Sequence, residues 1–93
     1  MKTIKYFSAK WCGPCRTFKP VMEEIASEGY SVQFIDIDES YSLQEEYKVT
    51  SVPTIVIEEN EIEVDRFIGA LPKKQVMQKL IDKNISRRDV IIK

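Results

Sequence analysis

Two cysteines are the residues of this chain best able to do covalent chemistry. Cys12 and Cys15 are separated by two residues, and the chain has no other cysteine and no histidine. A thiolate at such a pair can attack a disulfide, and the second thiol can then resolve the mixed disulfide by closing a short intramolecular bond. The spacing therefore indicates thiol-disulfide exchange, with Cys12 as the nucleophile and Cys15 as the resolving thiol.

The two residues between the cysteines suit this reaction. Gly13 allows the backbone to bend tightly, and Pro14 fixes a helical φ without costing a hydrogen bond. We expect Cys12 to stand where a strand passes into a helix, so that unpaired backbone N–H groups and the helix dipole stabilise its thiolate. Cys15 then lies about one helical turn later on the same helix face, within reach of Cys12.

Two other uses of the cysteines are disfavoured by the rest of the composition. Tetrahedral zinc needs four ligands, and this chain offers two cysteines and no histidine, so we expect no metal site. A cysteine hydrolase needs a histidine as its general base, and none is present. Redox chemistry of the pair is the interpretation that remains.

Length and charge limit the class of protein further. A chain of 93 residues, 43% of them hydrophobic, has room for one core, and we expect a single domain over residues 1–93. Its 14 basic and 15 acidic residues leave a net charge of −1. Because this balance produces no field that would gather nucleic acid or an anionic membrane, we expect neither as a partner.

The N-terminal residues 1–8 give an expectation about location. They contain no apolar core of the kind that signal peptides carry, and no apolar run in the chain reaches the roughly 18 residues of a membrane helix. We therefore expect a cytoplasmic protein. Thiols are kept reduced in that compartment, so the pair is more typical of redox or metal chemistry than of a structural disulfide.

The first half of the chain reads as strand, helix, strand, helix. Residues 3–8 form the first expected strand, and apolar residues then recur at helical spacing from Gly13 until Gly29 provides a stop. A second β-rich run covers residues 32–37, and Ser42 with Glu45 has the pattern of a capping box for a short helix. The first two strands should be parallel, because a helix connects them.

The second half reads as two strands and a helix. Residues 53–57 are rich in β-branched side chains, and an alternating run follows after a turn that Asn60 favours. Pro72 can occupy the first position of a last helix. The buried face of that helix should consist of Val76, Met77, Leu80 and Ile81. Residues 85–93, a C-terminal extension, fit a helix, a strand or a cover for apolar surface equally well.

Several motifs together resemble the thioredoxin family over residues 3–84. They are Trp11-Cys12-Gly13-Pro14-Cys15, Pro20 in the first helix, Val52-Pro53-Thr54 and Gly69-Ala70. The resemblance implies the α/β thioredoxin fold, in the order βαβαββα, with a central four-stranded mixed sheet flanked by helices. It also implies a thiol-disulfide oxidoreductase that reduces protein disulfides.

The resemblance further implies roles for particular residues and partners. Pro53 should be cis and lie beside the cysteines, supporting the active site together with Trp11, Gly13 and Pro14. A substrate-binding surface should consist of Trp11, Val52, Pro53, Gly69 and Ala70. The redox-active disulfide would need no cofactor. Expected partners of this monomer are thioredoxin reductase or an equivalent electron donor, and oxidised proteins such as ribonucleotide reductase or peroxidases.

Three departures from the family pattern bear on proton transfer and on the start of the chain. The buried aspartate of the family falls on Tyr6 and its lysine partner on Phe34, so this proton-handling pair is absent. Ser8 stands where a tryptophan is usual, and the cysteines arrive early in the chain. The sequence alone does not show what the replacements at Tyr6 and Phe34 do to proton transfer.

Two alternative functions remain to be distinguished. A glutaredoxin-like enzyme linked to glutathione would share the short segment before the cysteines, but its usual CPYC motif and Gly-Gly signature are missing. A thioredoxin-fold binding module would need neither thiol, so the intact Cys-Gly-Pro-Cys run argues against it.

Overall fold

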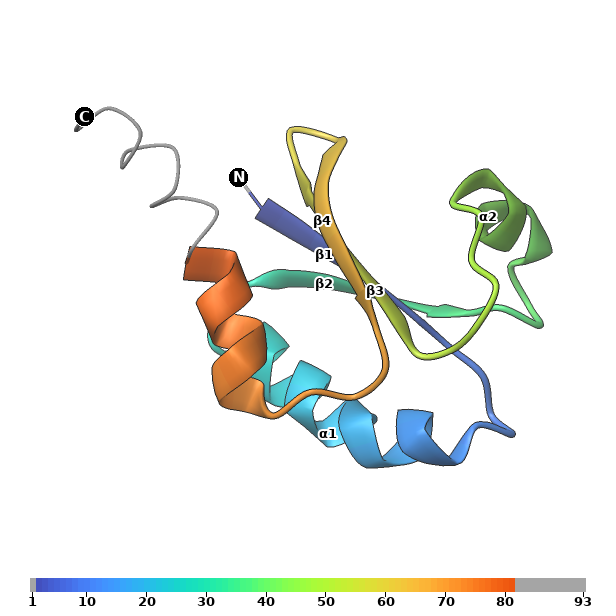
Figure 1. The fold of residues 1–93 in the computed structure, drawn as a ribbon, viewed down its shortest axis with the longest axis horizontal. Helices are drawn as coiled ribbons and strands as arrows, with labels where there is room; N and C mark the ends of the chain where they lie inside the picture. Colours follow the sequence, from blue (N-terminus) through green and yellow to red (C-terminus); the bar gives the residue numbers. More distant parts are fainter. Residues whose placement is uncertain (1, 82–93) are drawn as a thin grey trace.

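The computed structural model describes residues 2–81 as an α/β fold in the expected order βαβαββα (Figure 1). The elements are β1 (Lys2–Ser8), α1 (Gly13–Ser27), β2 (Ser31–Asp36), α2 (Tyr41–Glu46), β3 (Thr54–Glu59), β4 (Ile62–Ile68) and a last helix at 73–81. The expectations for segment 85–93 lie outside the described residues. None of the helices within residues 2–81 is long and apolar enough to cross a membrane.

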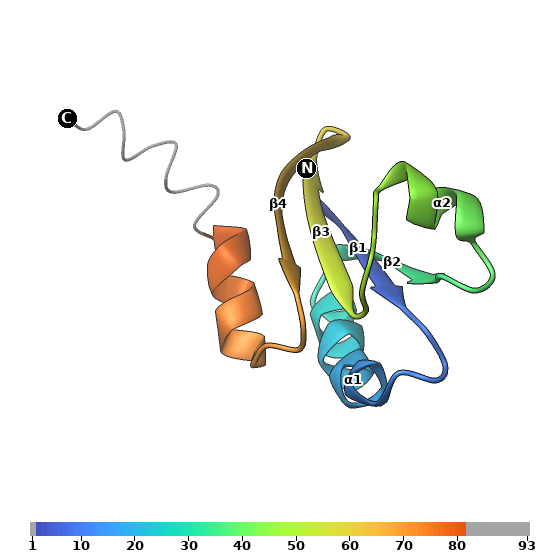
Figure 2. The ribbon, with the colours of Figure 1, turned by 45° about the vertical axis from the view of Figure 1, so that its right-hand side comes forward.

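The four strands form one mixed sheet in the order β2-β1-β3-β4. β1 and β2 are parallel, as predicted for strands that a helix connects, and β3 runs antiparallel to both β1 and β4. In Figures 1 and 2, α1 and the helix at 73–81 lie on one side of this sheet and α2 lies on the other. The mixed four-stranded sheet flanked by helices is thus confirmed.

Side chains of β1 alternate between the two sides of the sheet and contribute to a hydrophobic cluster on each side. Ile4 and Tyr6 join the larger cluster, in which side chains of α1 and the last helix pack against the sheet. Phe7, which directly follows Tyr6 in the strand, packs on the opposite side with Tyr47 after α2. Because β1 ends immediately before the cysteines, burial of both faces anchors the segment that carries the site.

α1 begins and ends where the sequence predicts. Phe18, Met22 and Ile25 are its buried residues together with Cys15. The helix ends at Ser27, and Gly29 follows with φ +106°, a conformation that glycine adopts without a steric cost. Pro20 lies inside the helix, where it supplies no backbone N–H to the ladder.

Two details of the other helices differ from the expectation. The predicted capping box at Ser42 and Glu45 is wrong, because Ser40 is the N-cap and its carbonyl accepts the first backbone bonds of α2, while Glu45 accepts a bond from the Tyr41 hydroxyl. In the last helix, Val76 and Leu80 are buried as predicted, but Ile81 is 42% exposed at the end of the described segment. The helical spacing of apolar residues does not show which of them other segments of the chain cover.

The turn between β3 and β4 consists of two residues with positive φ. Asn60 has φ 54° and Glu61 has φ 68°. Two such residues match a two-residue hairpin turn whose twist fits the flanking strands, and asparagine tolerates this conformation well. The predicted role of Asn60 is therefore confirmed.

A partly buried polar cluster on the α2 side of the sheet makes stability sensitive to alkaline pH. Tyr47 Oη donates to Glu58 Oε2 at 2.7 Å, and Lys5 Nζ lies 3.1 Å from Glu58 Oε1. Burial and the bond to Glu58 raise the pKa of Tyr47 to about 12. Since the raised pKa favours the neutral phenol in the folded state, its contribution is complete below the ordinary tyrosine value of about 10 and is lost as pH rises toward about 12.

We expect Tyr47→Phe to flatten this alkaline dependence. The free energy of unfolding of the wild type should fall more steeply between about pH 10 and pH 12 than that of the variant. Urea denaturation at a series of pH values measures both curves, and their difference isolates Tyr47 from the lysines that titrate in the same range. Parallel curves would contradict the expectation.

Candidate active site

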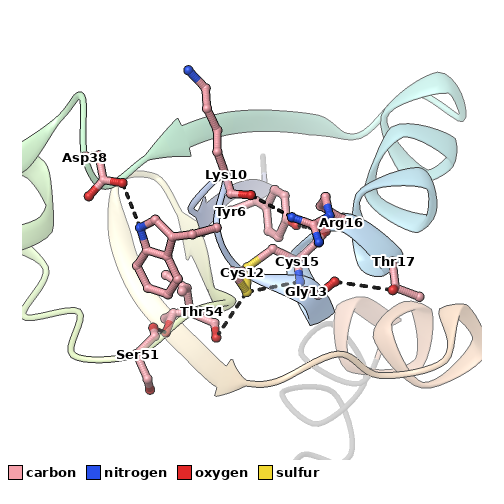
Figure 3. The surroundings of a disulfide bond; sticks show 12 residues. Tyr6, Lys10, Cys12, Gly13, Cys15, Arg16, Thr17, Asp38, Ser51 and Thr54 are labelled. Atoms are coloured by element: carbon pink, nitrogen blue, oxygen red, sulfur yellow. Dashed lines mark hydrogen bonds between the residues drawn. A yellow bond between two sulfur atoms is a disulfide. The ribbon is translucent and has the colours of Figure 1, made fainter.

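Cys12 is the N-cap of α1 and is joined to Cys15 by a disulfide (Figure 3). Its Sγ accepts the backbone N–H of Cys15 at 3.1 Å, so the sulfur satisfies one of the N–H groups that a helix start leaves unpaired. The Cα atoms of the two cysteines are 5.2 Å apart, within the usual range for a disulfide. The expected position of Cys12 between strand and helix is confirmed.

Gly13 and Pro14 fill the first turn of α1. Pro14 stands where its missing N–H costs no intrahelical bond. Thr17 Oγ1 lies 3.4 Å from the Gly13 carbonyl, and the Arg16 backbone N–H bonds to the Cys12 carbonyl at 3.3 Å. The first turn therefore holds both sulfurs in position.

Tyr6 lies behind the disulfide and contacts the helix that carries it. Its hydroxyl donates to the backbone carbonyl of Cys15 at 2.9 Å, and its ring lies edge-on to Phe18 at 5.8 Å and to Phe34 at 5.6 Å between centroids. Burial raises the pKa of Tyr6 above its ordinary value. Where the family has a carboxylate, this chain therefore has a neutral phenol that fixes the backbone of Cys15.

The loop before β3 contacts the disulfide. The Val52–Pro53 peptide bond is cis, as the family resemblance implies. The Val52 carbonyl oxygen lies 3.7 Å from Cys12 Sγ, and the Pro53 carbonyl accepts the backbone N–H of Gly69 at 2.9 Å. Gly69 has φ +98°, a conformation after β4 that glycine adopts without a steric cost.

Trp11 is 65% exposed next to Cys12, and its indole N–H donates to Asp38 Oδ2 at 2.9 Å (Figure 3). Asp38 follows β2, the strand parallel to β1. The sequence analysis did not single out this residue. A signal was available, because the carboxyl ends of neighbouring parallel strands meet at one edge of a sheet and Cys12 follows the other strand.

The structure brings most of the predicted site residues together. Cys12, Cys15 and Val52 belong to one apolar cluster, and Pro53 and Gly69 are connected to it through the bonds just described. Ala70 is exposed beside Gly69 and is not part of this cluster. Within residues 2–81, no group of three or more histidine, cysteine or carboxylate side chains is arranged to hold a metal ion.

Charged side chains of both signs lie near the start of α1. Lys10 Nζ lies 3.2 Å from Glu39 Oε2, and this bond raises the pKa of Lys10. Arg16 Nη1 donates to the Lys10 carbonyl at 2.8 Å and so ties the loop to the helix (Figure 3). Because Lys10 is paired with Glu39, the stabilisation of an anion at Cys12 comes from the N-terminal end of α1.

A cysteine pair that closes a disulfide at a helix start can accept and donate two electrons by exchange with other disulfides. This chemistry defines the class of thiol-disulfide oxidoreductases. The comparisons with known proteins agree. The family model described as Thioredoxin matches residues 2–83 of the chain.

Curated and solved thioredoxins are similar to this chain over most of its length. The thioredoxin of Mycoplasma pneumoniae is 42% identical over 79 residues, which cover 83% of this chain and 78% of that protein. The thioredoxin of Chlamydia trachomatis is 40% identical over 80 residues, covering 84% and 78%. The solved thioredoxin of Fasciola hepatica superposes with a TM-score of 0.81 at 32% identity, covering 87% of this chain and 79% of that one. The chain belongs to the thioredoxin family and is a thiol-disulfide oxidoreductase.

Proposed function

We propose that this chain is a general reductant of protein disulfides, with Cys12 as the nucleophile and Cys15 as the resolving thiol. The observation that carries the proposal is the position of Cys12, whose Sγ accepts a helix N-terminal N–H and lies beside the Val52 carbonyl. The first contact stabilises a thiolate, and the second places it next to a backbone segment on which an extended substrate can pair.

The reaction then proceeds in two exchanges. The Cys12 thiolate attacks one sulfur of the substrate disulfide, and the other substrate sulfur leaves as a thiolate that takes up a proton. Cys15, deprotonated, attacks Cys12, so the second substrate sulfur leaves and the Cys12–Cys15 disulfide closes. The substrate gains two electrons and two protons, and the protein loses them.

Trp11, Val52, Pro53, Gly69 and Ala70 form the proposed substrate surface. Main-chain pairing at Val52 would give affinity with little selectivity for side chains, which suits a reductant with many targets. Trp11 is exposed and its orientation is held by Asp38, so it can present an apolar face to a substrate without an ordering cost.

The proposal extends to the setting of the reaction. The partners are thioredoxin reductase or an equivalent electron donor, and oxidised proteins such as ribonucleotide reductase or peroxidases. The protein works as a cytoplasmic monomer of one domain over residues 1–93, with the disulfide as its redox group. The near-neutral charge of −1 supports partners other than nucleic acid or membrane.

The reduction potential of the Cys12–Cys15 couple tests the direction of the reaction. The protein is equilibrated in defined dithiothreitol and glutathione buffers, and the free thiols are counted by alkylation and mass spectrometry. A potential near about −270 mV supports a reductant, and a potential above about −200 mV would instead assign a glutathione-coupled or oxidising role. Absence of a reversible disulfide would refute the proposal.

A further inference from the structure

An open cavity of about 390 Å³ lies behind the disulfide, on the side of the sheet that α1 covers. Cys15 contributes to its lining, together with the hydroxyl residues Tyr6 and Ser8 and the carboxylate residue Asp36. The volume is enough for several water molecules, each of which occupies about 30 Å³ in the liquid. The proposed function gives this cavity no role.

The sheet register explains why these residues meet. In the parallel pair of β1 and β2, Tyr6 is the partner of Phe34 and Ser8 is the partner of Asp36. Residues two apart in a strand face the same side, so Ser8 and Asp36 share the side on which Tyr6 contacts α1. The ends of the neighbouring strands β1 and β2 therefore place the Ser8 hydroxyl and the Asp36 carboxylate in the lining of the cavity that Cys15 also lines.

The chemistry requires a proton to leave Cys15, and its other surroundings are closed to water. Cys15 is 2% exposed. It packs in an apolar cluster with Ala9 and Cys12, against which Ile37 and Val52 also pack. The cavity is the open space beside this thiol, and Ser8 and Asp36 contribute polar groups to its lining.

Asp36 is the acidic residue among those that line the cavity. Lys10, Arg16 and Lys19 are cations from α1 and the loop before it and cannot accept a proton at neutral pH. Tyr6 uses its hydroxyl hydrogen on the Cys15 carbonyl, and its raised pKa keeps it neutral. Asp38 and Glu39, next along the chain, are engaged with Trp11 and Lys10 respectively.

We propose that Asp36 accepts the proton of Cys15 through water held in this cavity, with Ser8 as a hydrogen-bonding relay. The inference rests on the proposed resolving role of Cys15. The Cys15 S–H bond breaks, its proton passes through water to the Asp36 carboxylate, and the thiolate forms the bond to Cys12 as the Cys12–substrate bond breaks. The departing substrate thiolate takes up a proton, and Asp36 returns its own to solvent.

The test measures the rate of the resolving step. Removal of the Asp36 carboxylate should change this rate in opposite directions if Asp36 accepts the proton and if it is only a nearby negative charge. Reduced protein is mixed with 5,5′-dithiobis(2-nitrobenzoate), and stopped-flow absorbance separates attack by Cys12 from the second release of thionitrobenzoate, which reports attack by Cys15. If Asp36 accepts the proton, Asp36→Asn slows the second phase at pH 7 by about tenfold or more. If Asp36 is only a nearby negative charge, its removal makes the Cys15 thiolate easier to form and speeds that phase.

The pH profile and chemical rescue add readouts that a structural role would not move. The pH dependence of the second phase should differ between the wild type and Asp36→Asn, and formate, a carboxylate small enough for the cavity, should restore the rate of the variant. Asn keeps the oxygen that accepts the Asp38 backbone N–H at 2.8 Å, so the turn after β2 should persist. As a second variant, Ser8→Val removes the relay and should also slow the second phase.

The matched control is Asp65→Asn, which removes the same charge from β4, away from the cavity lining. It should leave both phases unchanged. An unchanged or faster second phase in Asp36→Asn would overturn the inference while leaving the reversible disulfide intact. Loss of the disulfide in the wild type would instead refute the proposed function, so the two failures are distinguishable.

Discussion

Cys12→Ser should reduce the rate of disulfide reduction to the uncatalysed background. A serine hydroxyl at the N-cap of α1 can still accept the N–H of Cys15, so the helix start is kept while the nucleophile is lost. Because a thiolate, not an alcohol, attacks disulfides under these conditions, no mixed disulfide can form at position 12. Reduction of insulin disulfides in the presence of dithiothreitol measures the effect.

Cys15→Ser is the matched variant, with a different expected result. The first exchange should proceed, since Cys12 keeps its position, but the mixed disulfide should accumulate because no second thiol resolves it. Mass spectrometry under non-reducing conditions would show the covalent adduct in this variant and none in Cys12→Ser. If both variants retained activity, or if Cys12→Ser still captured substrates covalently, the assignment of the two roles would be wrong.

These variants also separate an enzyme from a binding module. A module whose thiols were idle would bind the same partners with the same affinity after either substitution, and no adduct would form. An oxidoreductase loses turnover in both variants, and loses the covalent adduct in the Cys12 variant alone.

The second large effect is expected at Tyr6, which connects the core to the site. Its side chain is nearly inaccessible to solvent, packs against Phe18 and Phe34, and donates its hydroxyl hydrogen to the Cys15 carbonyl. Tyr6→Ala removes a large buried ring and leaves a cavity, so the free energy of unfolding should fall by about 3–5 kcal/mol. Against a typical total of about 5–15 kcal/mol, this loss puts folding at risk.

Tyr6→Phe separates the ring from the hydroxyl. It keeps the packing and removes one hydrogen bond to the Cys15 carbonyl, so the loss should be about 1 kcal/mol. Urea denaturation of the oxidised proteins measures both variants, and Tyr41→Phe serves as the control at an exposed tyrosine. Equal losses in Tyr6→Ala and Tyr6→Phe would show that the ring contributes little, contrary to its burial.

Local patterns predicted the elements that position the site. The helix from Gly13 could be recognised from the apolar spacing of Phe18, Met22 and Ile25, because helix periodicity is a property of neighbours in sequence. The cysteine pair was equally visible, since its chemistry depends on two residues one helical turn apart. The failures at Ser42 and Ile81 concern a boundary and an exposed edge, which local patterns describe least well.

The contacts that surround the cysteines could not be predicted from local patterns. Trp11 and Asp38 meet because two parallel strands end at the same edge, and Ser8 faces the same cavity as Asp36 because of the β1–β2 register. These contacts join residues far apart in the chain, so no local pattern reports them.

The sequence by itself determined the reactive pair, the order of the elements and, through its motifs, the resemblance to a family whose model matches the chain. Each of these depends on residue types and short spacings. Only the tertiary structure decided what stands behind Cys15, namely the Tyr6 hydroxyl on its carbonyl and an open cavity with the Asp36 carboxylate. The physical reason is that strand register and helix packing, which act between distant segments, choose the neighbours of a buried thiol.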